Sequence, residues 1–233
     1  MIQLTEEQRM IQKTIRNLAI EKIFPLVAET DEAGECNREI LALLAKNGLF
    51  KLRLPEKYGG INAGATTRAL VIEGLSKVDA GTALYVFTTC CPIDFIIDFG
   101  SKEQQDRFFS SWQRGDKIGS FALSEPDFGS DAASLTTKAV LDGDYYLVNG
   151  TKAWVSSGGV ADFFIVFVRT GPGEREKGIS SLIMEKNTPG FTLPPPENKL
   201  GLRTNETNQL VLVDARVHKD NRLGEEGDGV GAI

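Results

Sequence analysis

The spacing of apolar residues divides the chain into a helical first half and a β-rich second half. From Leu4 to about Arg114, apolar residues return every three or four positions, which is the period of a helix face. The first predicted helix starts near Leu4 and is closed by Pro25, because proline cannot continue a helix from its interior. Further helices are predicted over residues 38–46, 66–78, 84–99 and 101–114.

After Lys117 the apolar period changes to two, and residues 118–123 are predicted to form the first strand. The dipeptides Asp142-Gly143 and Asn149-Gly150 lie between β-rich runs. Such dipeptides supply the positive φ angles of tight hairpin turns, so we expect a three-strand meander here. Further strands are expected at 163–170, 180–186 and 208–217. The fold class is therefore α+β, with an all-α domain at 1–116 and a small β-barrel or sandwich at 117–233.

Composition narrows the class of protein. The 233 residues carry a formal net charge of −6, which argues against a nucleic-acid-binding surface. The three cysteines form no C-x-x-C pair, which argues against a disulfide framework or a zinc site. No apolar stretch approaching the roughly 20 residues of a membrane span is expected, and the N-terminus contains acids rather than a signal sequence. We therefore predict a cytoplasmic protein without membrane insertion.

Two polar stretches interrupt this regular pattern, SFALSEPDFGSD at 120–131 and VNGTKAWVSSGG at 148–159. A surface turn and a core-facing tryptophan would explain them without any ligand. Alternatively, strand backbone groups, hydroxyls and an indole would together suit a flat heteroaromatic ring. Gly129-Ser130 would then let the backbone approach a phosphate. A hydrolase triad is not predicted, because His218 is the only histidine and no G-x-S-x-G motif is present.

These stretches resemble the two signatures of the acyl-CoA dehydrogenase family. FALSEPDFGSD resembles its Thr/Ser-Glu-Pro-x-x-Gly-Ser-Asp, and NGTKAWVSSGG resembles its Asn-Gly-x-Lys-x-Trp-Ile-Ser/Thr-Asn/Ser. LPEKYGG, FGSKEQQDRFF and KLGLRTNETNQLVLVDARV resemble further family segments in the right order, so the resemblance covers essentially the whole chain. It implies a helical N-terminal domain packed on a β-barrel middle domain, with FAD in the cleft between them.

The resemblance also implies roles for individual residues. Phe121 and Leu123 would offer backbone groups to the flavin pyrimidine edge, and Ser124 would place its hydroxyl near N1 and O2. Ser156 would lie at the flavin N5, with Trp154 packed beside the isoalloxazine.

The family pattern extends to the substrate. Gly129 and Ser130 would lie near the pyrophosphate and the CoA entrance. One face of the helix predicted at 84–99 carries Leu84, Phe87, Thr88 and Cys91. The corresponding helix of the family lines the acyl-tail pocket, although an ordinary core face would show the same residues. The bulk of Phe87 favours a short or compact acyl group.

The sequence also departs from the family pattern. Residues 203–208, RTNETN, replace Arg-x-Ser-Asp-Thr-Arg, so that Asn205 and Asn208 stand in place of a serine and an arginine. The chain also ends at Ile233, where the family's C-terminal helical bundle would begin. The catalytic base, usually a glutamate, belongs to that bundle, so no catalytic residue is predicted in this chain.

The resemblance therefore implies FAD-dependent α,β-dehydrogenation of an acyl-CoA to the 2-enoyl-CoA, by a fragment or subunit without the catalytic-base domain. Electron-transferring flavoprotein would accept the electrons, and we expect a homo-oligomer or a partner subunit that carries the bundle. Two alternatives stay open. The same scaffold could serve another flavin reaction, of the nitroalkane oxidase or monooxygenase type, or it could be a non-catalytic flavin- or CoA-binding module.

Overall fold

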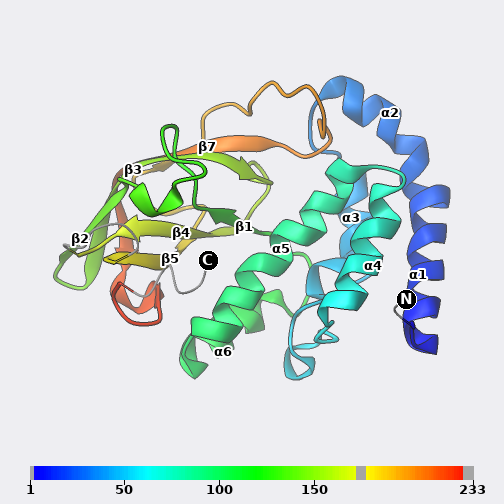
Figure 1. Ribbon diagram of the computed structural model, residues 1–233, viewed down its shortest axis with the longest axis horizontal. Helices are drawn as coiled ribbons and strands as arrows, with labels where there is room; N and C mark the ends of the chain where they lie inside the picture. Colours follow the sequence, from blue (N-terminus) through cyan, green and yellow to red (C-terminus); the bar gives the residue numbers. More distant parts are fainter. Residues whose placement is uncertain (1–2, 172–176, 228–233) are drawn as a thin grey trace.

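The computed structural model describes residues 3–171 and 177–227. Helices make up the first half and a mixed sheet makes up the second, as the apolar periods predict. Figure 1 shows the two parts side by side, with the longest helix, α5, running between helices α1 to α4 and the strands. The helices are α1 (Glu6–Leu18), α2 (Phe24–Ala33), α3 (Arg38–Lys46), α4 (Ala65–Ser76), α5 (Ala80–Phe99) and α6 (Lys102–Trp112).

The expectation that Pro25 closes the first helix is wrong. A π-helical turn over Ala19–Ile23 joins α1 directly to α2, and Pro25 occupies the first turn of α2. Proline is tolerated there because the π-helical turn before it interrupts the regular i→i−4 hydrogen bonds, which proline cannot make. The helical run ends instead at Gly34, whose φ of 68° is the left-handed conformation that glycine adopts easily.

α5 is longer than its apolar pattern indicated. It starts at Ala80, because the Asp79 carboxylate caps it by accepting hydrogen bonds from the N–H groups of Gly81 and Thr82. Its 20 residues are long and apolar enough to cross a membrane, which corrects the expectation that no segment is. However, 61% of its most apolar window is buried inside the protein, as in the core helix of a globular fold.

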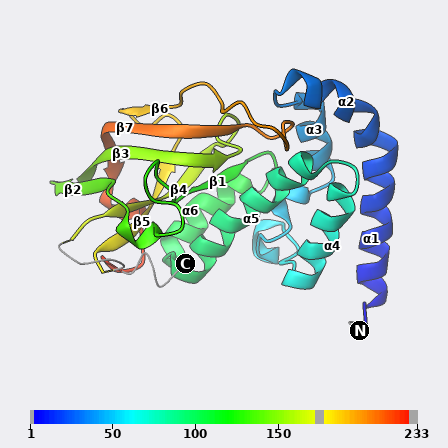
Figure 2. The ribbon, with the colours of Figure 1, turned by 45° about the horizontal axis from the view of Figure 1, so that its top comes forward.

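The strands of the second half form one mixed sheet. They are β1 (Gly119–Ala122), β2 (Lys138–Asp142), β3 (Tyr145–Ser156), β4 (Phe163–Arg169), β5 (Ile179–Glu185), β6 (Phe191–Thr192), β7 (Thr207–His218) and β8 (Arg222–Leu223). The path runs β6-β7-β3-β2-β4-β5-β8, with β1 paired in parallel with β4. Figure 2 shows β3 and β7 passing over β1 and β4, so the sheet curves strongly around its core.

The predicted three-strand meander is only half right. The turn at Asp142-Gly143 joins β2 to β3, but Asn149-Gly150 lies inside β3, where a register shift against β7 marks a bulge. Gly150 has a φ of 150°, and a Cβ at that position would lie only 2.5 Å from the Thr137 Oγ1. The glycine is therefore needed for close approach of the backbone to Thr137 and does not mark a turn.

The helices and the sheet share a hydrophobic core. One continuous cluster of buried side chains includes Leu44 of α3, Val86 of α5 and Val166 of β4. A second cluster joins α6 to β4 through Trp112 and Phe163, whose ring centroids are 4.2 Å apart. This packing fixes α5 against β1, and the candidate site lies along that contact.

Candidate functional site

A cavity of about 380 Å³ opens between α5, β1 and the end of β3. Its walls combine apolar rings with hydroxyl groups. The residues that line it are Phe87, Thr88, Cys91 and Phe95 from α5; Ser120, Phe121, Leu123 and Ser124 from β1 and the turn after it; and Ala153, Trp154 and Ser156 from β3.

The β1 wall depends on close approach of a strand to a helix. Gly119 lies against α5, and a Cβ there would lie 3.0 Å from the Pro92 Cγ. Two residues later, the ring of Phe121 packs between those of Phe95 and Phe167, with centroids 5.3 and 4.8 Å away. These aromatic contacts fix one side of the cavity.

The β3 wall is formed by a distorted strand end. The pairing of β3 with β7 shifts register between Lys152 and Val155, and Trp154 within that bulge has a φ of 60°. A left-handed backbone is unusual for a bulky residue and marks a locally constrained segment. The bulge turns the Trp154 side chain out of the sheet, where it is 63% exposed at the edge of the cavity. Ser156 follows it on the same wall.

A buried ion pair holds the two polar stretches together. The Lys152 Nζ lies 2.9 Å from the Glu125 Oε1, and it also donates to the Leu123 carbonyl at 3.1 Å. The remaining acceptor capacity of Glu125 is used by the N–H groups of Thr136 and Thr137, at 2.7 and 2.8 Å. Both charged side chains are almost completely buried.

The pKa of Glu125 reflects this arrangement. Burial alone would raise it, but the hydrogen bonds from Thr137 and the charge of Lys152 outweigh that effect and hold the pKa at about 2. Burial also lowers the pKa of Lys152 to about 8, against the opposing effect of Glu125. Glu125 is therefore an ionised structural group at neutral pH, and it is not available as a general base.

The α5 wall is apolar with few reactive groups. Phe87 is 49% exposed and projects from the helix face that Thr88, Cys91 and Phe95 share. Burial raises the pKa of the Cys91 thiol to about 11, so the thiol is neutral at pH 7 and a poor nucleophile. The wall suits contact with an apolar ligand.

The structure brings together most of the residues singled out in the sequence. Those at the cavity are Phe121, Leu123, Ser124, Trp154, Ser156, Phe87, Thr88 and Cys91. Leu84, one helical turn before Thr88, is not part of the lining. Gly129 and Ser130 are exposed in the loop after the Glu125–Phe128 turn, also outside it.

Several site residues were missed by sequence reasoning. Ser120, Ala153 and Phe95 line the cavity, and the pairing of Glu125 with Lys152 was not foreseen. Nothing in the alternation of polar and apolar residues around Ser120 indicated that this serine would be buried and would bond to Ser156 at the end of β3. A lysine between apolar strand residues, as in TKAWV, was a signal for Lys152, because buried lysines need a partner.

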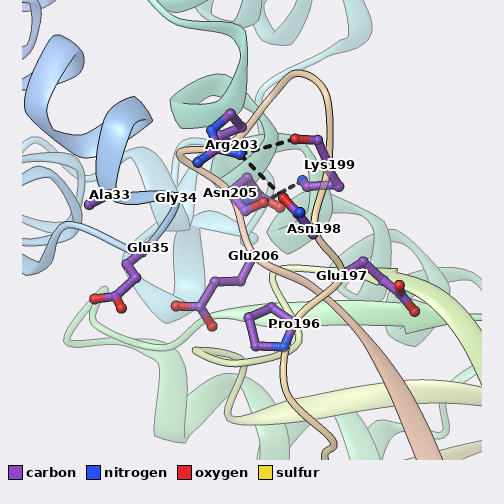
Figure 3. A pocket seen from close by; sticks show the side chains of 10 residues that line it. All are labelled: Ala33, Gly34, Glu35, Pro196, Glu197, Asn198, Lys199, Arg203, Asn205 and Glu206. Atoms are coloured by element: carbon purple, nitrogen blue, oxygen red, sulfur yellow. Dashed lines mark hydrogen bonds between the residues drawn. The ribbon is translucent and has the colours of Figure 1, made fainter.

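A second cavity of about 240 Å³ lies between the end of α2 and the loop before β7. Figure 3 shows its polar lining, with the carboxylates of Glu35 and Glu206 on one side and Arg203 on the other. Arg203 donates to the carbonyls of Asp31 and Glu32 at the end of α2, at 2.8 and 3.2 Å. This cavity lacks the aromatic walls that a flat ring requires, so we take the first cavity as the candidate site.

Comparison with known proteins identifies the family. The N-terminal domain model of acyl-CoA dehydrogenases matches residues 5–116, and the middle domain model matches residues 120–215. An acyl-CoA dehydrogenase of Bacillus subtilis is 39% identical over 228 residues, which are 97% of this chain and 60% of that protein.

Solved structures agree with this result. Butyryl-CoA dehydrogenase from Megasphaera elsdenii has a TM-score of 0.93 and 35% identity, covering 100% of this chain and 62% of its own. An acyl-CoA dehydrogenase from Bacillus anthracis complexed with FAD has a TM-score of 0.88 and 32% identity, covering 98% and 39%. The chain thus spans less than two thirds of the length of these relatives. Both domain models and these relatives show that the chain belongs to the acyl-CoA dehydrogenase family.

Proposed function

We propose that the cavity between α5, β1 and β3 holds the isoalloxazine ring of FAD, in a protein that converts an acyl-CoA to the 2-enoyl-CoA. One observation carries the proposal. The two sequence stretches 120–131 and 148–159 contribute Ser124, Ser156 and Trp154 to one cavity, opposite an apolar helix face. The family is one of FAD enzymes, and the relative from Bacillus anthracis was solved with FAD.

The residues at the cavity suit this cofactor. An isoalloxazine is flat, with apolar faces and polar edges, and the walls supply both kinds of contact. Ser124 and Ser156 offer hydroxyls for the ring edge, and the exposed indole of Trp154 offers a face. Gly129 and Ser130, in the exposed loop outside the cavity, remain candidates for the pyrophosphate and the CoA entrance. When bound, FAD would accept a hydride from the β-carbon of the substrate.

The chain's own residues divide the work in a specific way. They bind and orient the ring and shield it from water with Phe87, Phe95 and Phe121. Removal of the α-proton needs a general base, which in this family is usually a glutamate. Glu125 cannot serve, because it is buried and paired with Lys152. In this proposal the base comes from a part of the protein outside this chain.

The acyl group is proposed to be short. Phe87 and Phe95 narrow the α5 side of the cavity, where the acyl tail would lie beside Thr88 and Cys91. The structurally similar protein from Megasphaera elsdenii is named for butyryl-CoA, which is a short acyl substrate. Electron transfer to an electron-transferring flavoprotein, assembly into an oligomer and a cytoplasmic location belong to the same proposal.

FAD titration of the purified chain tests the proposal. We expect binding with a change in the flavin absorption spectrum, and a further spectral change when butyryl-CoA is added. Ser156→Ala should weaken FAD binding about tenfold, because it removes one buried hydrogen bond to the ring. Ser110→Ala is the matched control, since the Ser110 hydroxyl donates to the Asp106 carbonyl within α6. Equal FAD affinity in all three proteins would contradict the role of Ser156, and no binding by the unsubstituted chain would contradict the site.

A further inference from the structure

The peptide between Ser156 and Ser157 is held from both sides by buried groups. On one side, the Ser120 Oγ donates to the Ser156 carbonyl at 2.6 Å. On the other, the Ser157 N–H donates to the Asn205 Oδ1 at 3.1 Å and to the Glu206 carbonyl at 2.7 Å. Ser120, Ser157 and Asn205 are all 0% exposed. The direction of the Ser156 side chain is therefore set by contacts behind the cavity wall.

Ser157 itself is in an unfavourable conformation. Its φ of 61° lies in the left-handed region, which costs a residue other than glycine about 1 kcal/mol or more. Such a conformation persists only where surrounding contacts hold it. Asn205 makes two of these contacts, because its Nδ2 also donates to the Ser157 Oγ at 2.9 Å.

The hydrogen bonds continue into the helix on the far side of the cavity. The Oγ atoms of Ser157 and Thr88 are 2.8 Å apart, and the Thr88 hydroxyl donates to the Leu84 carbonyl at 2.8 Å. The only consistent direction runs from Asn205 through Ser157 to Thr88 and then to Leu84. Thr88 lines the same cavity as Ser156. One buried network therefore joins the strand end and the helix that face each other across the site.

We infer that Asn205 is a positioning residue for the flavin site: its two hydrogen bonds keep Ser157 left-handed, and so aim the Ser156 hydroxyl into the cavity. This inference rests on the FAD site proposed above. Asn205 reaches no cavity atom itself and acts through Ser157. Figure 3 shows Asn205 among the residues that line the second cavity.

The two residues also suggest a sharp test. This chain pairs a hydroxyl at position 157 with an amide at position 205. An amide at 157 and a hydroxyl at 205 would restore one amide–hydroxyl pair with the roles exchanged. Asparagine also tolerates a left-handed backbone better than serine does. The exchange should therefore preserve the function of the pair, while either single change should not.

The experiment compares Asn205→Ala, Asn205→Ser and the double variant Ser157→Asn/Asn205→Ser with the unsubstituted chain. FAD affinity and the absorption spectrum of bound flavin are measured well below the unfolding temperature of each protein. We expect about tenfold weaker binding and an altered spectrum for both single variants, with most of the affinity recovered in the double variant. Asn198→Ala is the control, because Asn198 lies in the same loop and its side chain accepts a hydrogen bond from Arg203 at 3.4 Å.

The outcomes separate the two claims. If the unsubstituted chain binds no FAD, the proposed function fails and this inference fails with it. If that chain binds FAD and the single variants bind equally well, only the positioning role fails, even if those variants unfold more easily. A double variant no better than Asn205→Ser would also overturn the inference, because the loss would then not depend on the amide–hydroxyl pair.

Discussion

At the scale of single residues, the buried pair of Glu125 and Lys152 decides how the two polar stretches meet. Glu125 belongs to SEPDFGSD and Lys152 to NGTKAWVSS, and their charged atoms lie 2.9 Å apart with almost no solvent contact. Taking two charges out of water is costly, so the pair is favourable only because Thr136, Thr137 and the Leu123 carbonyl satisfy the remaining groups.

Glu125→Gln is expected to lower the free energy of unfolding by about 3–5 kcal/mol, because it leaves the Lys152 charge buried without a counter-ion. The measurement is urea unfolding at neutral pH. Glu125→Gln/Lys152→Met should recover part of the loss by removing that charge. Asp144→Asn is the control, since solvent screens the exposed pair of Lys219 and Asp144 and its loss should change the stability little. If Glu125→Gln and Asp144→Asn lowered the unfolding free energy equally, the burial of the Glu125–Lys152 pair would make no difference to its contribution.

At the scale of elements, α5 connects the two halves of the molecule. It packs on α4 and β1 and lines the cavity along one face. Its N-terminal cap belongs to both halves, since the Asp79 carboxylate accepts from the N–H of Thr82 and from the Thr204 hydroxyl, at 2.7 and 2.6 Å. The Tyr85 hydroxyl donates to the Thr204 carbonyl at 2.8 Å nearby.

Asp79→Ala is expected to destabilise the protein by about 2 kcal/mol, because it removes a helix cap and also leaves the Thr204 hydroxyl without its acceptor. Ser101→Ala is a matched comparison: Ser101 caps α6 through the N–H of Gln104. It should cost about 1 kcal/mol. Thermal or urea unfolding of both variants checks the difference. A cost for Asp79→Ala no greater than that for Ser101→Ala would mean that the bond to Thr204 contributes nothing.

At the scale of the whole molecule, the segment from Lys199 to Glu206 joins the helices to the sheet. Arg203 binds the carbonyls at the end of α2, Thr204 binds α5 and Asn205 binds the end of β3. Gly34 leaves room for this contact, since a Cβ there would lie 2.9 Å from the Arg203 Nη2. The geometry of the cavity therefore depends on both halves together.

The stability of the whole fold should depend on pH through Glu125. Its pKa is lowered from 4.5 to about 2 by folding, so its contribution is complete above about pH 4.5 and is lost as the pH falls toward 2. The unsubstituted chain should therefore be more stable than Glu125→Gln at pH 6, and this difference in unfolding free energy should shrink by about 2 kcal/mol as the pH falls from about 6 to about 3. A constant difference across this range would contradict the low pKa.

The sequence by itself determined the order of helices and strands and the two stretches that meet at the cavity. Helical and alternating apolar periods are local properties, so they placed α3 and β4 closely. They also located the motifs that carry Ser124, Trp154 and Ser156. The division at residues 116 and 117 and the flavin roles of these residues stay predictions.

Only the tertiary structure decided the features that depend on distant contacts. Asn149-Gly150 looks like a hairpin turn, but Thr137 and β7 make it a bulge inside β3. Likewise, nothing local distinguishes Asn205 from a surface loop residue. Its burial against Ser157, 48 positions earlier in the chain, gives it a place behind the cavity. Local sequence encodes backbone preference, whereas packing decides which polar groups lose water and must find each other as partners.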